Sequence, residues 1–129
     1  MVEIKKDSKY SISFIFDTDD IRIFLQAFQY VLNNEHKIEI NNIKIDKRIF
    51  YSKQKGWVIT KLFIKKGKSC LYEHNNNYIL ELDEDDLEYG IELLENNIKL
   101  GYFEVAEFVK IKLPNINKLI DIYFFQNTI

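Results

Sequence analysis

FDTDDI (Phe16–Ile21) and LDEDDL (Leu82–Leu87) are two versions of one short acidic segment, and they decide how the chain divides. In each version, an alternating apolar run ends just before the acids, and a helical apolar pattern begins just after them. Carboxylates at such a position accept hydrogen bonds from the unpaired N–H groups of a helix start and oppose its partial positive charge. We therefore predict helix starts at Asp17 or Thr18 and at Asp83.

The second segment follows the first at an offset of 66 residues, and the same offset continues through both helical patterns. The corresponding apolar pairs are Leu25 and Ile91, Phe28 and Leu94, and Leu32 and Ile98. Two strand-like segments follow each helix. These correspondences favour an internal duplication of two β-α-β-β halves, about 1–66 and 67–129. Coincidence is the alternative, because a strand, an acidic cap and an amphipathic helix are generic parts.

Strand patterns fill most of the remaining sequence. Alternating, β-branched or aromatic runs cover 10–16, 57–64, 70–74, 78–82, 102–113 and 118–125. HKIEINNIKID (36–46) changes the parity of its isoleucines, so we predict a hairpin that turns at Asn41 and Asn42 and pairs Ile40 with Ile43. We expect one α+β domain over residues 1–129, with a mainly antiparallel sheet and two amphipathic helices packed on one face.

The composition supports one hydrophobic core and argues against several classes of function. Hydrophobic residues make up 47% of the 129 residues, and the net charge of −2 gives no overall attraction to nucleic acid or to an anionic membrane. No apolar run reaches membrane-spanning length. The single cysteine excludes an internal disulfide and a multi-cysteine zinc site. With no apolar leader segment, the sequence predicts a cytoplasmic protein.

The acids do not fit a calcium-binding loop, and the one glycine–lysine motif does not fit a phosphate-binding loop. An EF-hand counted from Asp17 would need glycine and glutamate where the chain has Arg22 and Phe28. The run GKS at 67–69 lacks the first glycine of a P-loop, because that position is Leu62. Helix capping is the better explanation for the acids.

His36, His74 and Cys70 are the remaining candidates for chemistry. Neither histidine has a nearby cluster with metal-ligand spacing. Cys70 lies in a strand-like run, where a packed side chain is a better interpretation than a nucleophile paired with histidine. We expect no catalytic residues, no metal and no cofactor. An enzyme whose site forms only in three dimensions stays open, and a pocket that gathers these side chains would support it.

The charged residues separate into two blocks. Nine basic residues and one acid, Asp46, lie between Lys44 and Lys68, whereas nine acids and no Lys or Arg lie between Ser69 and Ile98. One interpretation is that the blocks neutralise each other within the fold or are solvated. The other is that the acidic block docks a basic partner.

Each predicted helix also has a second apolar face. In the second helix, Tyr89 and Leu93 lie opposite the stripe that includes Leu87 and Leu94. Ile23, Ala27 and Tyr30 are the corresponding residues in the first helix. Close side-by-side packing of the helices would explain these faces, and so would contact with another chain. A homodimer through them is a further prediction.

The polarised acidic helix DEDDLEYGIELLENN (83–97), in a short chain without a catalytic set, resembles the immunity proteins of bacterial toxin systems in general build. The resemblance implies a protein partner, a basic toxin domain that the immunity protein binds and blocks. The spacing of the acids around the aromatic residue predicts which residues make the contacts. They are Asp85, Glu88, Tyr89, Glu92 and Glu95.

The alternative is a module that binds single-stranded nucleic acid through the basic strands of 44–68. Its binding face would consist of Arg48, Lys53, Lys55, Trp57 and Lys61. Phe50 and Tyr51 are further candidates for base stacking. The nearly neutral total charge makes nucleic acid the less favoured partner.

Overall fold

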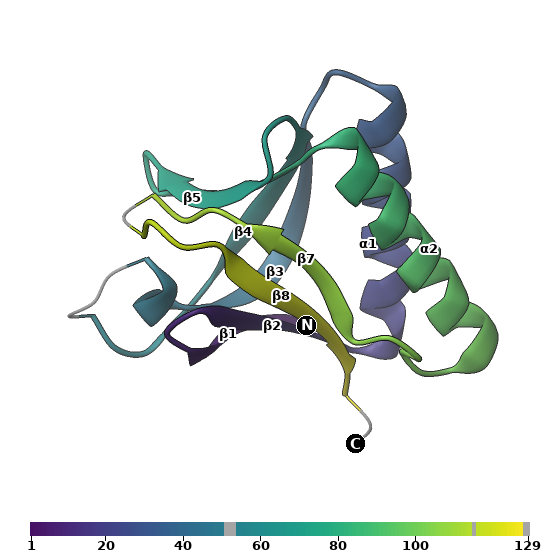
Figure 1. Ribbon diagram of the computed structural model, residues 1–129, viewed down its shortest axis with the longest axis horizontal. Coiled ribbons are helices and arrows are strands. Elements are labelled where there is room, and N and C mark those ends of the chain that lie inside the picture. The colour runs from purple at the N-terminus through teal and green to yellow at the C-terminus, as the bar shows by residue number, and fades with distance from the viewer. Residues whose placement is uncertain (51–53, 115, 128–129) are drawn as a thin grey trace.

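The computed structural model describes residues 1–50, 54–114 and 116–127, and Figure 1 shows its two helices side by side along one side of a strongly curved sheet. In chain order the elements are β1 (Val2–Ser8), β2 (Ser11–Phe16), α1 (Thr18–Asn33), β3 (Ile38–Asp46), the short 3-10 helix η1 (Lys47–Ile49), β4 (Trp57–Lys66), β5 (Cys70–His74), β6 (Asn77–Leu82), α2 (Glu84–Leu100), β7 (Glu107–Ile111) and β8 (Ile120–Gln126). The α+β class and both helices are confirmed.

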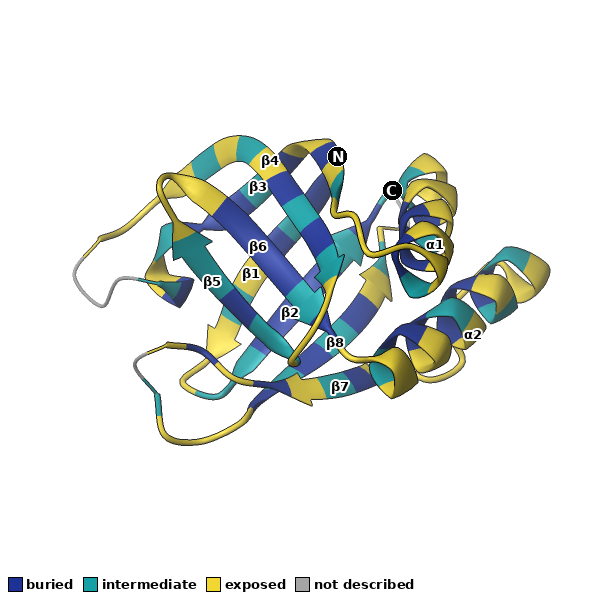
Figure 2. Ribbon diagram, turned by 90° about the horizontal axis from the view of Figure 1, so that it is seen from above, coloured by how far each residue is buried: buried dark blue, intermediate teal, exposed yellow. Residues whose placement is uncertain are grey.

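The sheet is mixed and nearly closed. Its strand order over the described residues is β5-β6-β4-β3-β1-β2-β8-β7, with four antiparallel and three parallel ladders. The two outermost strands meet at one parallel bridge, between Cys70 and Lys112, which gives the barrel-like shape seen in Figure 2. The prediction of a mainly antiparallel sheet is therefore wrong. Parallel ladders such as β2–β8 join segments far apart in the chain, so no turn between neighbouring strands announces them.

The second half of the chain repeats the strand pairing of the first. The order β1-β2-α1-β3-β4 is followed by β5-β6-α2-β7-β8, and each half consists of two antiparallel hairpins around its helix. The parallel ladders β2–β8 and β6–β4 correspond, and the Cys70–Lys112 bridge takes the place of the β1–β3 ladder. Each half is thus ββαββ and not the expected β-α-β-β. The sequence patterns did not predict β1, the strand that begins the first half. The duplication itself stays a prediction.

Both helices begin at the predicted acids. Asp17 and Asp83 are the N-caps of α1 and α2. The backbone N–H of Asp86 donates to Oδ1 of Asp83 at 2.8 Å, and the backbone N–H of Asp17 donates to Oδ2 of Asp20 at 3.0 Å. Figure 1 shows these two helix starts at opposite ends of the helix pair. The acids therefore serve as caps, and the structure does not gather them into one cluster.

The helices bury five equivalent positions. In α1 these are Ile21, Phe24, Ala27, Phe28 and Val31, and in α2 they are Leu87, Gly90, Leu93, Leu94 and Asn97, each 66 residues later. Ala27 and Leu93, which we expected on a second, outward face, are only 1% and 5% exposed. That part of the prediction is wrong, because α1 and α2 pack against each other and widen the buried arc of each helix. Ile23, Tyr30 and Tyr89 do remain exposed.

The predicted hairpin at Asn41 and Asn42 is also wrong, because β3 runs through both residues. Ile40 and Ile43 both pair with β4, opposite Leu62 and Thr60. The register shifts between them, and Asn42 has a φ of 58°, in the left-handed region that asparagine tolerates. A bulge within one strand, and not a turn between two, therefore keeps both isoleucines in the core.

The core lies between the inner surface of the sheet and the helix pair, as the dark blue positions in Figure 2 show. Phenylalanine rings dominate it. Phe16 lies edge-on to Phe24 of α1 and to Phe124 of β8, each with ring centroids 5.0 Å apart. These rings come from both halves of the chain, and they pack the inner side of the helix pair closely against the sheet.

Candidate functional site

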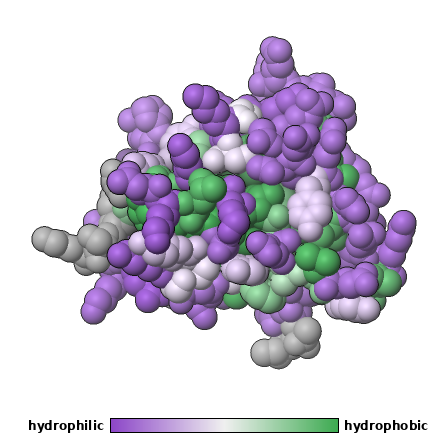
Figure 3. Space-filling model, viewed as in Figure 1, coloured by the Kyte–Doolittle hydropathy of each residue, from purple (hydrophilic) through white to green (hydrophobic). Residues whose placement is uncertain are grey.

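The five residues predicted to bind a partner lie together on the outer side of α2. Asp85, Glu88, Tyr89, Glu92 and Glu95 are all exposed, whereas the opposite side of the helix is buried against α1 and the core. Figure 3 shows mainly hydrophilic side chains on the side of the molecule where α2 lies in Figure 1. We call these five residues the acidic α2 face. The helix that carries this face begins at its N-cap, Asp83, and ends at its C-cap, Gly101, which has the left-handed conformation.

Most other acids of the acidic block have partners inside the fold. Asp86 accepts a hydrogen bond from the Ser69 hydroxyl, and Glu81 forms an ion pair with Lys65 at 3.0 Å. By contrast, the carboxylates of the acidic α2 face form no ion pair with any described residue. Capping and internal pairing therefore explain the acids around the helix start, where Asp85 lies in the first turn, but not Glu88, Glu92 and Glu95 further along the helix.

The equivalent strand pairing of the two halves allows a comparison of these acids with the residues at the same positions of α1. The α1 positions equivalent to the four carboxylates are Asp19, Arg22, Gln26 and Gln29, which are also exposed. The formal charge at these four positions is zero on α1 and −4 on α2. The two helices occupy equivalent places in the fold, so this difference in charge is not common to both positions.

Tyr89 is the aromatic residue within the acidic α2 face. Its ring stacks on Phe108 of β7, with centroids 6.4 Å apart and an angle of 17° between the planes, yet 36% of the residue is exposed. A ring fixed on one side and open on the other loses little conformational entropy when a partner covers it. The same position on α1 is Ile23, which is 46% exposed.

The basic block is partly neutralised within the fold. Arg48 forms an ion pair with Asp46 at 2.6 Å, and Lys61 pairs with Glu39 at 2.9 Å. Trp57 is 40% exposed, and Lys44 lies over its ring at 4.8 Å from the centroid. The alternative nucleic-acid face therefore keeps fewer free cations than its sequence suggests.

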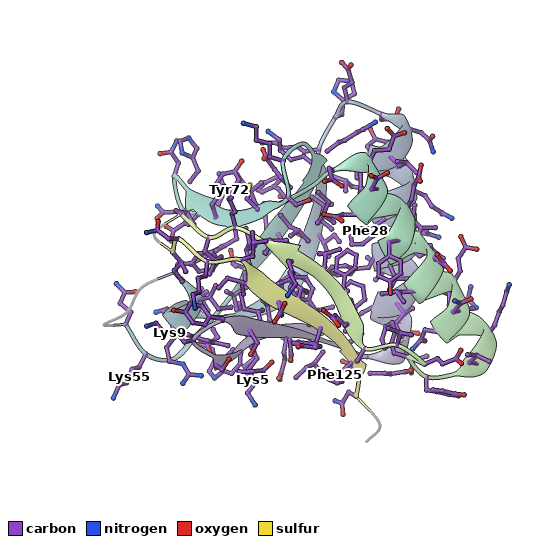
Figure 4. The ribbon with its side chains drawn as sticks, viewed as in Figure 1. Lys5, Lys9, Phe28, Lys55, Tyr72 and Phe125 are labelled. Atoms are coloured by element: carbon purple, nitrogen blue, oxygen red, sulfur yellow. The ribbon has the colours of Figure 1, made fainter. Side chains whose placement is uncertain are left out.

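The remaining residues of that alternative face are spread out. Lys55 is exposed, at the end of the barrel away from the helices in Figure 4. Phe50 is half-buried against Tyr78, with ring centroids 5.1 Å apart, so its ring is not free to stack on a base. Lys53 and Tyr51 lie outside the described residues.

The structure does not assemble the candidates for catalysis. Sγ of Cys70 lies 3.3 Å from Oε2 of Glu81, and burial together with this carboxylate raises the pKa of the thiol to about 12. His36 is exposed, and His74 hydrogen-bonds Asn75 in the β5–β6 turn. Among the residues that the structure describes, no three His, Cys, Asp or Glu side chains form a group that could hold a metal ion.

Sequence reasoning missed the polar cluster around Glu81. Its carboxylate accepts hydrogen bonds from Lys65, Tyr72 and Cys70, and Figure 4 shows Tyr72 on β5. The pairing of β5 with β6 places Cys70 opposite Glu81, so the antiparallel hairpin was the available signal. The cluster is saturated by its own hydrogen bonds and leaves no activated nucleophile.

No family model, curated protein or solved structure shows detectable similarity to the chain. None of the described helices has the length and apolar character of a membrane span.

Proposed function

We propose that this protein is a non-catalytic binding module whose acidic α2 face docks a basic protein partner. The observation that carries the proposal is the contrast between the two helices: four exposed, unpaired carboxylates on α2 against a neutral set at the same positions of α1. Charges in this arrangement steer a partner of opposite charge and raise its association rate. Tyr89 would then provide the desolvated centre of the contact.

The partner class suggested by the resemblance to immunity proteins is a basic toxin domain, which the protein would bind and block in the cytoplasm. A 17-residue helix is about 25 Å long, and a stable interface covers about 800 Å² on each partner. The contact would therefore extend beyond the acidic α2 face. Ile23 and Tyr30, exposed on the neighbouring helix, are available for it. A homodimer through two α2 helices is disfavoured, because it would bring eight carboxylates together.

The test compares two variants that change the net charge equally. In the first, Glu88, Glu92 and Glu95 are replaced by Gln. In the second, Asp19 is replaced by Asn, and Glu35 and Glu104 by Gln, all exposed and all outside the acidic α2 face. The partner is captured from a lysate of the native host by crosslinking and is then purified, and its association rate is measured at low and high salt.

The first variant should lower the association rate at low salt by at least about tenfold, and the second should change it little. Equal rates for both variants would rule out the acidic α2 face as the docking surface. A partner without a basic surface would contradict the proposal as a whole.

The second candidate function is binding of single-stranded nucleic acid, favoured by the exposed Trp57 beside Lys44. It predicts binding of a fluorescent oligonucleotide at low salt, with a steep loss as salt rises. Trp57→Ala and Lys55→Gln should each weaken such binding. An oligonucleotide that does not bind at low ionic strength would remove this candidate.

A further inference from the structure

The strand directions place all four hairpin connections at one end of the barrel. The pairs β1–β2, β3–β4, β5–β6 and β7–β8 are antiparallel, whereas β1 runs parallel to β3, β2 to β8 and β4 to β6. The connections within the four pairs therefore share one end, and the segments that carry α1 and α2 begin and finish at the other end. We call the described residues of these connections the basic end: 9–10, 47–50, 54–56, 75–76, 112–114 and 116–119.

The basic end contains six cations and no Asp or Glu. The cations are Lys9, Lys47, Arg48, Lys55, Lys112 and Lys118. Arg48 pairs with Asp46, and the five lysines form no ion pair with a described residue. Figure 4 shows Lys9 and Lys55 at this end of the molecule, on the side away from the helices. The hairpin connections therefore gather positive charge that the described part of the fold does not neutralise.

The helix end has the opposite charge. The segments 17–37, 67–69 and 83–106 contain twelve acids and four Lys or Arg, so their formal charge is −8. Four of these acids belong to the acidic α2 face, which also has no ion pair to a described residue. A chain with a net charge of only −2 is thus strongly polarised along the barrel.

Each end also has an apolar centre within its charged residues. At the basic end, Leu119 is 50% exposed and follows Lys118 in the chain. The Nζ atoms of Lys9 and Lys118 lie 5.4 and 4.9 Å from the ring centroid of Tyr10. At the helix end, Tyr89 lies among the carboxylates of the acidic α2 face. An apolar centre with a polar rim is the usual arrangement of a protein interface, and the rims of these two surfaces have opposite charges.

We propose that the protein associates with further copies of itself head to tail, with the acidic α2 face of one copy against the basic end of the next. The opposite charges would attract and orient the two copies, and Tyr89 would lie against Tyr10 and Leu119. Because the two surfaces are at opposite ends, each added copy leaves one of them free, and the contact repeats along an open chain. The inference rests on the same face as the proposed function, so a basic partner would compete with the next copy for it.

The test uses two variants, each of which keeps only one of the two surfaces. The acidic-face variant carries Glu88→Gln, Glu92→Gln and Glu95→Gln, and the basic-end variant carries Lys9→Gln, Lys112→Gln and Lys118→Gln. The charge-matched controls change exposed residues elsewhere: Asp19→Asn with Glu35→Gln and Glu104→Gln, and Lys5→Gln with Lys61→Gln and Lys68→Gln. All the replaced side chains are exposed, and an amide NMR spectrum of each variant checks that it is folded.

Sedimentation equilibrium of the natural protein at low salt should give a mass above 15.5 kDa that rises with chain concentration, and 15.5 kDa at high salt. The acidic-face and basic-end variants should each weaken self-association at least about tenfold, and the controls should change it little. An equimolar mixture of the two variants should reach the mass of two chains and no more, because only one complementary pair of surfaces remains.

A natural protein that stays monomeric at millimolar concentration and low salt would overturn the proposal. Association that persists at high salt, controls that act like the variants, or a variant mixture that stays monomeric would do the same. Heparin that binds the basic end of a protein without self-association would assign that end to an anionic partner instead. None of these results decides whether a foreign basic protein docks on the acidic α2 face, because that is measured by its own association rate.

Discussion

A Cβ atom placed on Gly90 of α2 would lie 2.5 Å from Cε2 of Phe28 in α1. It would also lie 2.9 Å from Cε1 of Phe108. Real Cβ atoms do not approach other carbon atoms so closely, so the absent side chain is what lets the two helices come together. Phe28 is itself fully buried, and Phe24 and Phe108 lie around it with ring centroids 6.2 and 6.0 Å away, so its ring has no free space to move into.

Gly90→Ala should therefore destabilise the protein, although alanine favours a helix. The gain in helix propensity is about 1 kcal/mol. The cost of overpacking a well-packed core is about 1–3 kcal/mol, and rings on both sides place Gly90 in the upper part of that range. We expect a net loss of about 1–2 kcal/mol in the free energy of unfolding, measured by urea denaturation. Gln26→Ala, at an exposed position of α1, is the control and should change little. Unchanged or increased stability of Gly90→Ala would contradict the close contact.

The positions of the helices could be predicted from the sequence, but their contact could not. The acids at Asp17 and Asp83 mark the helix starts because capping is a local interaction. The buried arc of each helix depends instead on what lies beside it. Gly90 corresponds to Phe24 under the 66-residue offset, so the smallest and one of the largest side chains occupy equivalent positions of the paired helices. No periodicity within one helix shows that arrangement.

The same reason limits the prediction of the sheet but not that of the acidic α2 face. Hairpins β5–β6 and β7–β8 follow from strands close in sequence, whereas the β2–β8 ladder pairs Ser11 with Asp121 and has no local signal. The acidic α2 face could be recognised because its members share one helix.

Asp46 is a buried carboxylate whose loss should be costly. Its side chain is 2% exposed, and it accepts hydrogen bonds from the Arg48 side chain and from the backbone N–H groups of Arg48 and Lys6. Asp46→Asn keeps the shape but removes the charge and one acceptor, so we expect a loss of about 1–3 kcal/mol in the free energy of unfolding at pH 7. The control is Asp121→Asn, which breaks the more exposed pair with Lys110 and should have a smaller effect.

The effect of Asp46→Asn should also depend on pH. Burial raises the pKa of Asp46, but the hydrogen bonds from Arg48 and Lys6 lower it more, so the folded-state pKa lies below the ordinary value of 3.8. Stability from this carboxylate is therefore fully present above that value and is lost as the pH falls through the lower, folded-state pKa. The stability difference between the natural protein and Asp46→Asn, measured by urea denaturation, should shrink below pH 4. A difference that grows on acidification would contradict this assignment.

Cys70 should react slowly with thiol reagents. Its pKa rises from 9.0 to about 12, first because the thiol is buried and then because Glu81 accepts its hydrogen bond and repels the thiolate. A rise of that size lowers the thiolate fraction near pH 8 by about 10³-fold, and alkylation by iodoacetamide should slow accordingly. Glu81→Gln removes the repelling charge and should accelerate alkylation, whereas Glu39→Gln, on β3, should not. A rate in the natural protein equal to that of a free thiol would contradict the buried Cys70–Glu81 contact.

The two halves of the chain should fold in either order. The amino group of Met1 lies 2.5 Å from Oδ2 of Asp17, and Nδ2 of Asn127 lies 3.3 Å from Oδ1 of the same residue, so a short Gly/Ser linker can join Asn127 to Met1. New ends between Gly67 and Lys68 fall in an exposed turn between β4 and β5, where the two halves meet in the sequence. The permuted chain then begins with β5 and keeps every helix and strand intact. Since the strand pairing of both halves is equivalent, we expect a native-like amide NMR spectrum and a cooperative unfolding transition.

The control is a permutant with the same linker and new ends between Gln26 and Ala27, inside α1. It breaks a buried helix, so it should unfold at much lower urea concentration or fail to fold. If the chain opened at Gly67 behaves like that control, the β4–β5 connection contributes more than a turn, and the two halves are not interchangeable units. Native-like folding of the first permutant alone would show that the order of the halves is not what specifies the barrel. The strand pairing that both halves share would then be sufficient to specify the barrel.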